Sequence, residues 1–140
     1  MTSDLSVREC REDEAAAVLD LWRQADTSVS VTDTIEDIRH AIRESVSMLL
    51  VAEMDGSIVG SVIGGFDGWR GNIYRLAVHP EFQRQGIARR LVSDIETHLS
   101  AMGVKRITAL VERDHPWATG YWDAIGYELD AGMARYVRNL

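Results

Sequence analysis

The stretch Asn72–Leu91, NIYRLAVHPEFQRQGIARRL, decides the fold of this chain. Its first residues are mostly apolar or aromatic and β-prone, which predicts a strand over residues 73–78. Pro80 ends that strand, because proline has no amide hydrogen for a sheet ladder. Apolar residues then recur at a spacing of four and predict an amphipathic helix: Ile87, Leu91, Ile95 and Leu99. The predicted order is therefore strand, polar loop containing Gly86, and helix.

The junction between this strand and this helix is a predicted anion site. The first N–H groups of a helix have no partner within the helix, and the helix dipole favours negative charge there. A phosphate or pyrophosphate suits such a site. Gly86 and Ala88 keep side chains out of the way, and Arg84, Arg89 and Arg90 add positive charge. A simple turn would also place one glycine at a helix start, so the residues alone leave that alternative open.

The part of the chain before this stretch predicts a short strand, two helices and a hairpin. Their ranges are Leu5–Cys10 for the strand, Glu12–Ala25 and Thr34 to about Ser45 for the helices, and Ser47–Met54 and Ser57–Phe66 for the hairpin. Asp33, with Glu36 three residues later, is the start signal of the second helix. Asp55-Gly56 is the hairpin signal, because both residues tolerate the positive φ of a tight turn. The hairpin and the central strand together predict an antiparallel meander.

The part after the long helix predicts a second parallel strand and a small C-terminal region. The long helix runs over Ile87–Met102 and ends near Gly103, and the apolar run Arg106–Val111 completes a right-handed βαβ crossover. A short helix ending at Ile125-Gly126 and a last strand or hairpin over Tyr127–Val137 follow. The predicted fold class is α/β, of the α+β kind with a mixed sheet and about four helices, in a single domain over residues 1–140.

The residues QRQGIA at 83–88 resemble the Q/R-x-x-G-x-G/A motif of the GNAT superfamily, the acetyl-CoA-dependent N-acetyltransferases. The preceding RLAVHPEF resembles the usual lead-in to that motif. The stretch is unlike a dinucleotide fingerprint or a Walker loop. The resemblance covers essentially the whole chain. The chain is similar in particular to small bacterial members such as the ribosomal-protein alanine N-acetyltransferases. It implies the GNAT acyl-CoA N-acyltransferase fold, with acetyl-CoA as acyl donor.

The composition of the chain limits the kinds of partner that it can bind. Its 140 residues, 46% of them hydrophobic, suffice for one core. A net charge of −7 argues against nucleic-acid binding and suits a cationic amine. Cys10 is the only cysteine and the four histidines are scattered, so we expect neither a disulfide nor a metal site. The chain shows no signal-peptide pattern and no run of 18 apolar residues, so we expect a cytoplasmic protein without membrane contact.

The resemblance implies where the acetyl donor binds. The central strand is expected to splay from the Arg106–Val111 strand, with the pantetheine amides bonded to the backbone at Leu76 and Val78. Pyrophosphate is expected on the N–H groups of the loop and helix start. The residues of that segment are Gln83, Arg84, Gln85, Gly86, Ile87, Ala88 and Arg89.

Acetyl transfer to an amine requires a group that accepts the ammonium proton. Glu112 is the candidate base, because it follows the parallel strand and by alternation shares a face with Leu110, where the ribosomal-protein enzymes look to carry their glutamate. A solvated carboxylate at the strand end is the alternative. Glu53 and Asp67 are weaker candidates. The family implies direct attack in a ternary complex, so Cys10 is expected to pack rather than to act as a nucleophile.

The C-terminal segment departs from the family pattern. Many members carry F-Y-x-x-x-G-F, whose tyrosine protonates the leaving thiolate, and here the residues are YWDAIGY at 121–127. Trp122 stands in the place of that tyrosine, and an indole cannot protonate a thiolate. We expect Trp122 to pack on the pantetheine arm. Three outcomes stay open for the thiolate: Tyr121 supplies the proton, water supplies it, or the thiolate leaves unprotonated, and Tyr121 is the local donor among them. His115 stands where an asparagine is often found near the same arm.

Three functions are compatible with these residues. The first is an N-acetyltransferase that moves an acetyl group to a primary amine, either a small molecule or a protein N-terminus. The alternative is a non-catalytic acyl-CoA-binding or sensing domain, and the third is transfer from another CoA thioester. Residues 26–33, at the connection of the first two helices, border the acceptor site in this family, but they do not identify the acceptor. A homodimer is left open, with Trp69 as one candidate contact.

Overall fold

The computed structural model describes residues 4–25, 30–112 and 118–140. Backbone contacts divide the chain into two compact units, residues 1–110 and residues 111–140, and each is described by itself. A single domain over residues 1–140 therefore stays a prediction. No helix within the described residues is long and apolar enough to cross a membrane.

The first unit is built on a five-stranded mixed sheet, with the strands in chain order from one edge to the other. The strands are β1 Ser6–Glu9, β2 Ser47–Met54, β3 Ser57–Phe66, β4 Gly71–Val78 and β5 Ile107–Ala109. β1 to β4 pair antiparallel, and β4 pairs with β5 in parallel. The predicted meander is confirmed. Its hairpin turns at Asp55-Gly56, which take φ of 53° and 78°.

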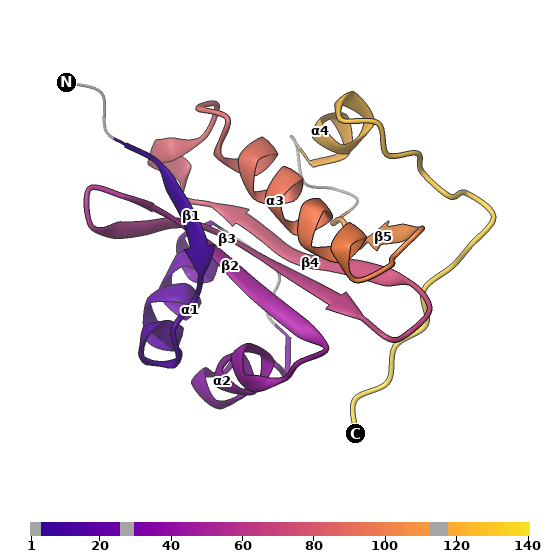
Figure 1. Cartoon of the computed structure of the whole chain (residues 1–140), viewed down its shortest axis with the longest axis horizontal. Helices are drawn as coiled ribbons and strands as arrows, with labels where there is room; N and C mark the ends of the chain where they lie inside the picture. Colours follow the sequence, from indigo (N-terminus) through magenta and orange to yellow (C-terminus); the bar gives the residue numbers. More distant parts are fainter. Residues whose placement is uncertain (1–3, 26–29, 113–117) are drawn as a thin grey trace. The chain divides into compact units, whose positions relative to one another are not determined.

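Helices cover both faces of this sheet (Figure 1). The helices of the first unit are α1 Ala15–Gln24, α2 Ile35–Arg43 and α3 Ile87–Ala101, with short 3-10 turns at Glu12–Glu14 and Pro80–Phe82. α1 and α2 lie on one face, where Val18, Leu21 and Ile38 pack with Leu49 and Val51. α3 lies on the other face. The mixed class agrees with the predicted fold, and the described residues contain four α-helices when α4 of the second unit is counted.

The long helix α3 buries the predicted apolar stripe. Leu91 and Ile95 are fully buried, and Ile87 and Leu99 nearly so. β3 allows the helix to come close because it presents glycines to it: a Cβ added to Gly64 would lie 2.5 Å from Cγ1 of Ile95. The helix face and the glycines of the facing strand therefore belong to one packing unit.

The start signal predicted for α2 is wrong by one residue. Thr34 is the N-cap, and its hydroxyl accepts a hydrogen bond from the backbone N–H of Asp37 at 3.1 Å. Asp33 does not cap the helix because its carboxylate is turned toward β4, where it pairs with Arg75 at 2.7 Å. α2 also ends at Arg43, before the predicted Ser45, because Glu44 is already extended, with φ −75° and ψ 137°.

Two predictions for the end of the chain are wrong. β5 covers only Ile107–Ala109 instead of Arg106–Val111, and its ladder stops just before an irregularity in β4 that interrupts regular pairing. In the second unit, α4 Ala118–Ala124 is present, but the described residues 127–140 form no strand. A strand needs a partner to take up its backbone groups, and here the chain instead turns at Asp130, whose C=O accepts from Met133 N–H at 3.3 Å.

Candidate active site

The last part of β4 is unpaired on the side of β5. The two strands pair only at Gly71–Ile73, and a hydrogen bond of 3.1 Å from Leu110 N–H to the C=O of Ile73 closes the ladder. β4 continues to Val78, and the edge of residues 74–78 facing β5 has no strand partner in the described part of residues 4–110. β5 itself ends at Ala109, so the structure shows the end of the pairing, and the splay of the two strands stays a prediction. Because backbone groups need partners, an extended ligand can bond along this edge.

A β-bulge shapes β4 at the same place. Ser61 of β3 opposes Ala77, but Ile63 opposes Tyr74, so β4 holds one extra residue between these pairs. Arg75 lies at the bulge with φ of 53°, a left-handed backbone conformation that residues other than glycine rarely adopt. Such backbone strain costs on the order of 1–3 kcal/mol and persists only where the surroundings enforce it.

A buried polar network enforces this conformation. Ser61, fully buried on β3, donates a hydrogen bond from its hydroxyl to the C=O of Arg75 at 3.3 Å and accepts one from the indole Nε1 of Trp22 at 2.9 Å. The guanidinium of Arg75 lies 5.2 Å from the centre of the Trp22 ring and pairs with Asp33. Trp22 is thus a core residue, as predicted, and it also holds the bulge in place.

The loop after β4 returns to this strand end. His79 accepts the N–H of Glu81 on its Nδ1 at 3.1 Å, which starts the turn that contains Pro80. Gln83 donates from its side-chain amide to the C=O of Val78 at 3.4 Å. The strand end and the loop predicted to bind the donor are therefore joined by a direct contact.

The start of α3 has the features of an anion site. Gly86 is the N-cap with φ of 79°, and no side chain caps the helix. The first N–H groups of the helix have no acceptor within it. Glycine is favoured at position 86 by its positive φ, and the space beside its backbone is open, since a Cβ there would meet nothing within 4 Å. Arg84 and Arg89 are exposed nearby in the chain, whereas Arg90 is paired with Asp94 at 3.1 Å.

The remaining predicted site residues belong to the second unit. Glu112 is exposed and lies beyond β5, so the alternation argument that linked it to Leu110 does not hold. His115 lies outside the described residues. Trp122 is 7% exposed and packs edge-on against Tyr121 and Tyr127, with ring centres 5.5 and 4.8 Å apart. Their roles stay predictions.

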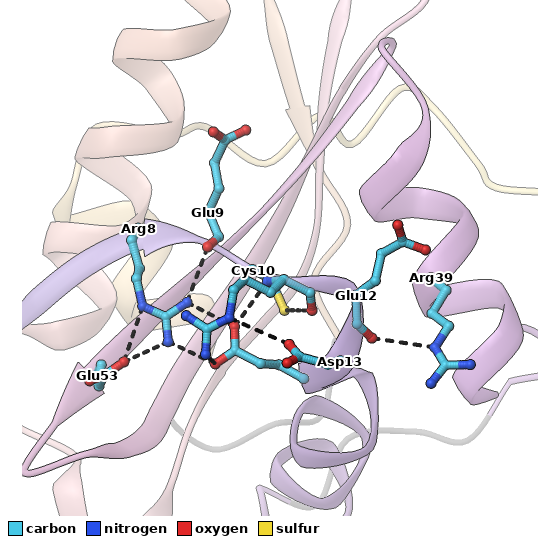
Figure 2. A network of polar contacts seen from close by, with 9 residues as sticks. Arg8, Glu9, Cys10, Glu12, Asp13, Arg39 and Glu53 are labelled. Carbon is cyan, nitrogen blue, oxygen red and sulfur yellow. Dashed lines mark hydrogen bonds and ion pairs between the residues drawn. The ribbon is translucent and has the colours of Figure 1, made fainter.

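The two weaker base candidates have structural partners. Glu53 accepts two hydrogen bonds from Arg8, one of them from Nε at 3.0 Å, within a network at β1 that Figure 2 shows. Arg8 also holds Glu14 and lowers the pKa of that carboxyl to about 2. Asp67 accepts the N–H groups of Arg70 and Trp69 at 2.8 and 2.9 Å, and these bonds lower its pKa. The lowered pKa makes Asp67 a poor proton acceptor.

Cys10 has the properties of a packed residue. It is 5% exposed, and burial raises the pKa of its thiol to about 12. The thiol donates to the C=O of Arg11 at 3.4 Å (Figure 2). Because the thiolate is the nucleophilic form, Cys10 is not suited to form an acyl-enzyme.

Sequence reasoning missed three residues of this site: Asp33, Ser61 and Arg75. A polar residue inside an apolar strand was the available signal for Ser61 and Arg75. No local signal connects Asp33 with Arg75, because the pair is 42 residues apart in the chain.

Comparison with known proteins gives the family. Residues 13–127 match the model of the acetyltransferase (GNAT) family, so the chain belongs to this family. An aminoglycoside N-acetyltransferase AAC(6')-Iy in complex with CoA has 14% identity and a TM-score of 0.84, over 100% of this chain and 98% of that chain. The PaiA N-acetyltransferase from Thermoplasma acidophilum with coenzyme A has 14% identity and a TM-score of 0.83, over 91% of each chain.

A third solved structure extends the likeness. The aminoglycoside 6'-N-acetyltransferase AAC(6')-Ih from Acinetobacter baumannii has 16% identity and a TM-score of 0.79, over 98% of this chain and 99% of that chain. At such identities the likeness shows the fold. Together with the family match it confirms the predicted class, an acetyl-CoA-dependent N-acetyltransferase with the GNAT fold.

Proposed function

We propose that this N-acetyltransferase binds acetyl-CoA along residues 74–89. The observation that carries the proposal is that pairing of β4 with β5 ends at Ile73 while β4 continues to Val78, which leaves backbone groups without a strand partner on one edge. Pantetheine amides bond to the backbone at Leu76 and Val78. The pyrophosphate binds the N–H groups of residues 84–89, with Gly86 as the residue that keeps the approach open.

The reaction is direct attack of a neutral amine on the thioester. The new bond joins the amine nitrogen to the acetyl carbon, and the bond from that carbon to sulfur breaks. Glu112 accepts the ammonium proton, through water. The nitrogen loses its second proton after the attack, and Tyr121 or water returns one proton to the thiolate, so that the products are the amide and the free thiol. His115 and Trp122 are proposed neighbours of the pantetheine arm.

The acceptor is a cationic primary amine, either a small molecule or a peptide N-terminus. The net charge of −7 supports this class, since an acidic protein attracts cations. Similar structures include acetyltransferases of aminoglycosides, which are polyamines. Action in the cytoplasm and assembly as a homodimer are parts of the same proposal, the latter supported by Trp69, which is 74% exposed at the β3–β4 turn.

Two measurements test this proposal against the alternative of a non-catalytic sensing domain. Calorimetry measures acetyl-CoA binding, and release of free thiol measures turnover with spermidine, sisomicin and a peptide with an N-terminal alanine. We expect micromolar to millimolar binding and turnover with at least one amine. Binding without turnover across the panel would favour the non-catalytic domain, which the replacement of the family tyrosine by Trp122 also favours. No binding at millimolar acetyl-CoA would refute the donor site. Propionyl-CoA and succinyl-CoA in the same assay test the third alternative.

A further inference from the structure

The ion pair between Asp33 and Arg75 links two distant parts of the first unit. Nη2 of Arg75 lies 2.7 Å from Oδ1 of Asp33, and the two side chains are 18% and 8% exposed. The other carboxylate oxygen of Asp33 accepts the N–H of Ser30 at 3.1 Å. Thr34, the next residue, caps α2. The pair therefore ties the start of α2 to the bulge of β4.

Arg75 is held at both its ends. Its C=O accepts a hydrogen bond from the Ser61 hydroxyl, and its guanidinium pairs with Asp33 and lies over the Trp22 ring. A largely buried ion pair is weak evidence of a contribution to stability, because desolvation offsets the attraction. It is better suited to fix one geometry. The geometry that it fixes is the φ of 53° at Arg75, directly before Leu76.

We propose that the Asp33–Arg75 pair is a positioning latch, which holds the backbone of the bulge within the strand edge proposed to bind the acetyl donor and keeps it in register with the start of α2. Asp33 and Arg75 are positioning residues, since they act through the backbone of β4. The inference rests on the proposed function, because it requires the donor to lie along this strand edge.

The latch should affect rate more than donor affinity. A small displacement of a reacting group can lower the rate by roughly 10²-fold. The pyrophosphate site at the start of α3 does not depend on Arg75. Loss of the latch should therefore lower kcat about 10- to 100-fold and change the Kd of acetyl-CoA by less than about threefold.

A double-mutant cycle tests the latch. The variants are Asp33→Asn, Arg75→Gln and the double variant, with Arg75→Lys as the conservative change. The control is Glu12→Gln, which removes an ion pair of the same length, 2.7 Å to Arg43, on the exposed surface. Each protein is assayed for kcat with the best amine of the panel, for the Kd of acetyl-CoA by calorimetry, and for its melting temperature.

Support for the latch is a lower kcat in both single variants, no further loss in the double variant, partial recovery in Arg75→Lys and no change in Glu12→Gln. Should Asp33→Asn fail to fold, Arg75→Lys still reports, because it keeps the positive charge beside Asp33 and loses only the guanidinium geometry. Lower melting temperatures with unchanged kcat would mean a purely structural pair and would overturn the latch. A wild-type protein that neither binds nor turns over acetyl-CoA would refute the proposed function, and the latch with it.

Discussion

Residues 71–101 and residues 118–140 both carry candidate site residues, but they are built in different ways. The first segment comprises β4, paired with β3 along its length, and α3, which buries five apolar side chains. The second contains one short helix and a cluster of three aromatic rings, in which Trp122 contacts Tyr121 and Tyr127. Most of its large apolar residues beyond that cluster are exposed, among them Leu129, Met133 and Tyr136.

The difference separates two kinds of site. The donor segment offers mainly backbone groups, and packing and strand register set their positions. The C-terminal segment offers side chains, whose effect depends on their protonation and direction. Substitutions that block the backbone groups of the first segment should therefore act on acetyl-CoA binding, and substitutions of the proton-transferring side chains of the second should act on the rate.

The largest expected effect is the loss of acetyl-CoA binding in Gly86→Val. A ligand at a hundredfold excess over its Kd stabilises the folded state by about 2.7 kcal/mol, which raises the melting temperature of wild-type protein by several degrees. Valine at Gly86 places a side chain over the N–H groups of α3 and disfavours the φ of 79°. We expect no shift with acetyl-CoA in thermal melts.

Gly56→Val is the matched control, because Gly56 has φ of 78° and the same open surroundings, in the turn between β2 and β3. It should lose comparable stability and keep the shift. Equal shifts in both variants would contradict the placement of the donor at the start of α3.

The next effect concerns Glu112→Gln. A positioned base contributes roughly 10²- to 10⁴-fold, so kcat should fall about 100-fold or more while the Kd of acetyl-CoA is unchanged. Glu128→Gln, at another exposed carboxylate of the same unit, is the control. Kinetics over a range of pH give the measurement. Full activity of Glu112→Gln would show that Glu112 is not the base and would favour the alternative, a solvated carboxylate.

The elements with strong local patterns could be predicted from the sequence. The apolar stripe of α3 and the Asp55-Gly56 turn are examples, since periodicity and positive φ tolerance are local properties. The end of β5 and the predicted strand over Tyr127–Val137 could not. Strand formation there depends on a partner that lies elsewhere in the chain, and the local pattern does not contain that information.

The segment proposed to bind the acetyl donor could be identified in the sequence for the same reason. The motif around Gly86 is contiguous, so its spacing could be read directly. The bulge at Arg75 was not visible, because it arises from a register shift between two strands. Asp33 was interpreted as a helix signal, and the competing ion pair with Arg75 could be found only in three dimensions.

A smaller effect is expected for Tyr121→Phe. Consecutive helix residues point about 100° apart, so Tyr121 is an imperfect substitute for a donor at position 122. The change should lower kcat by less than about tenfold, below the contribution of a well-positioned acid.

Trp122→Tyr should keep or raise kcat, and Trp122→Ala should weaken acetyl-CoA binding. If Trp122→Ala left the Kd unchanged in calorimetry, α4 would no longer be assigned to the donor site.

The last expected effect is on stability and not on catalysis, and it is a pH dependence that arises in the first unit. The pKa of Glu14 is about 2 in the folded protein because Arg8 holds its carboxylate, whereas its ordinary value is 4.5. The unfolded chain therefore takes up a proton at a higher pH than the folded one, and the contribution of Glu14 is full above about 4.5 and lost as the pH falls to about 2. Glu14→Gln should be less stable than wild type at pH 7, and the difference in the free energy of unfolding should shrink through this window. Urea unfolding at several pH values measures this difference, and hydrogen exchange of peptides from residues 6–110 and 118–140 shows which unit responds.

Asp13→Asn, whose carboxylate is 77% exposed, is the control. A difference that stayed constant down to pH 2 would show that Arg8 does not hold Glu14 in its charged form.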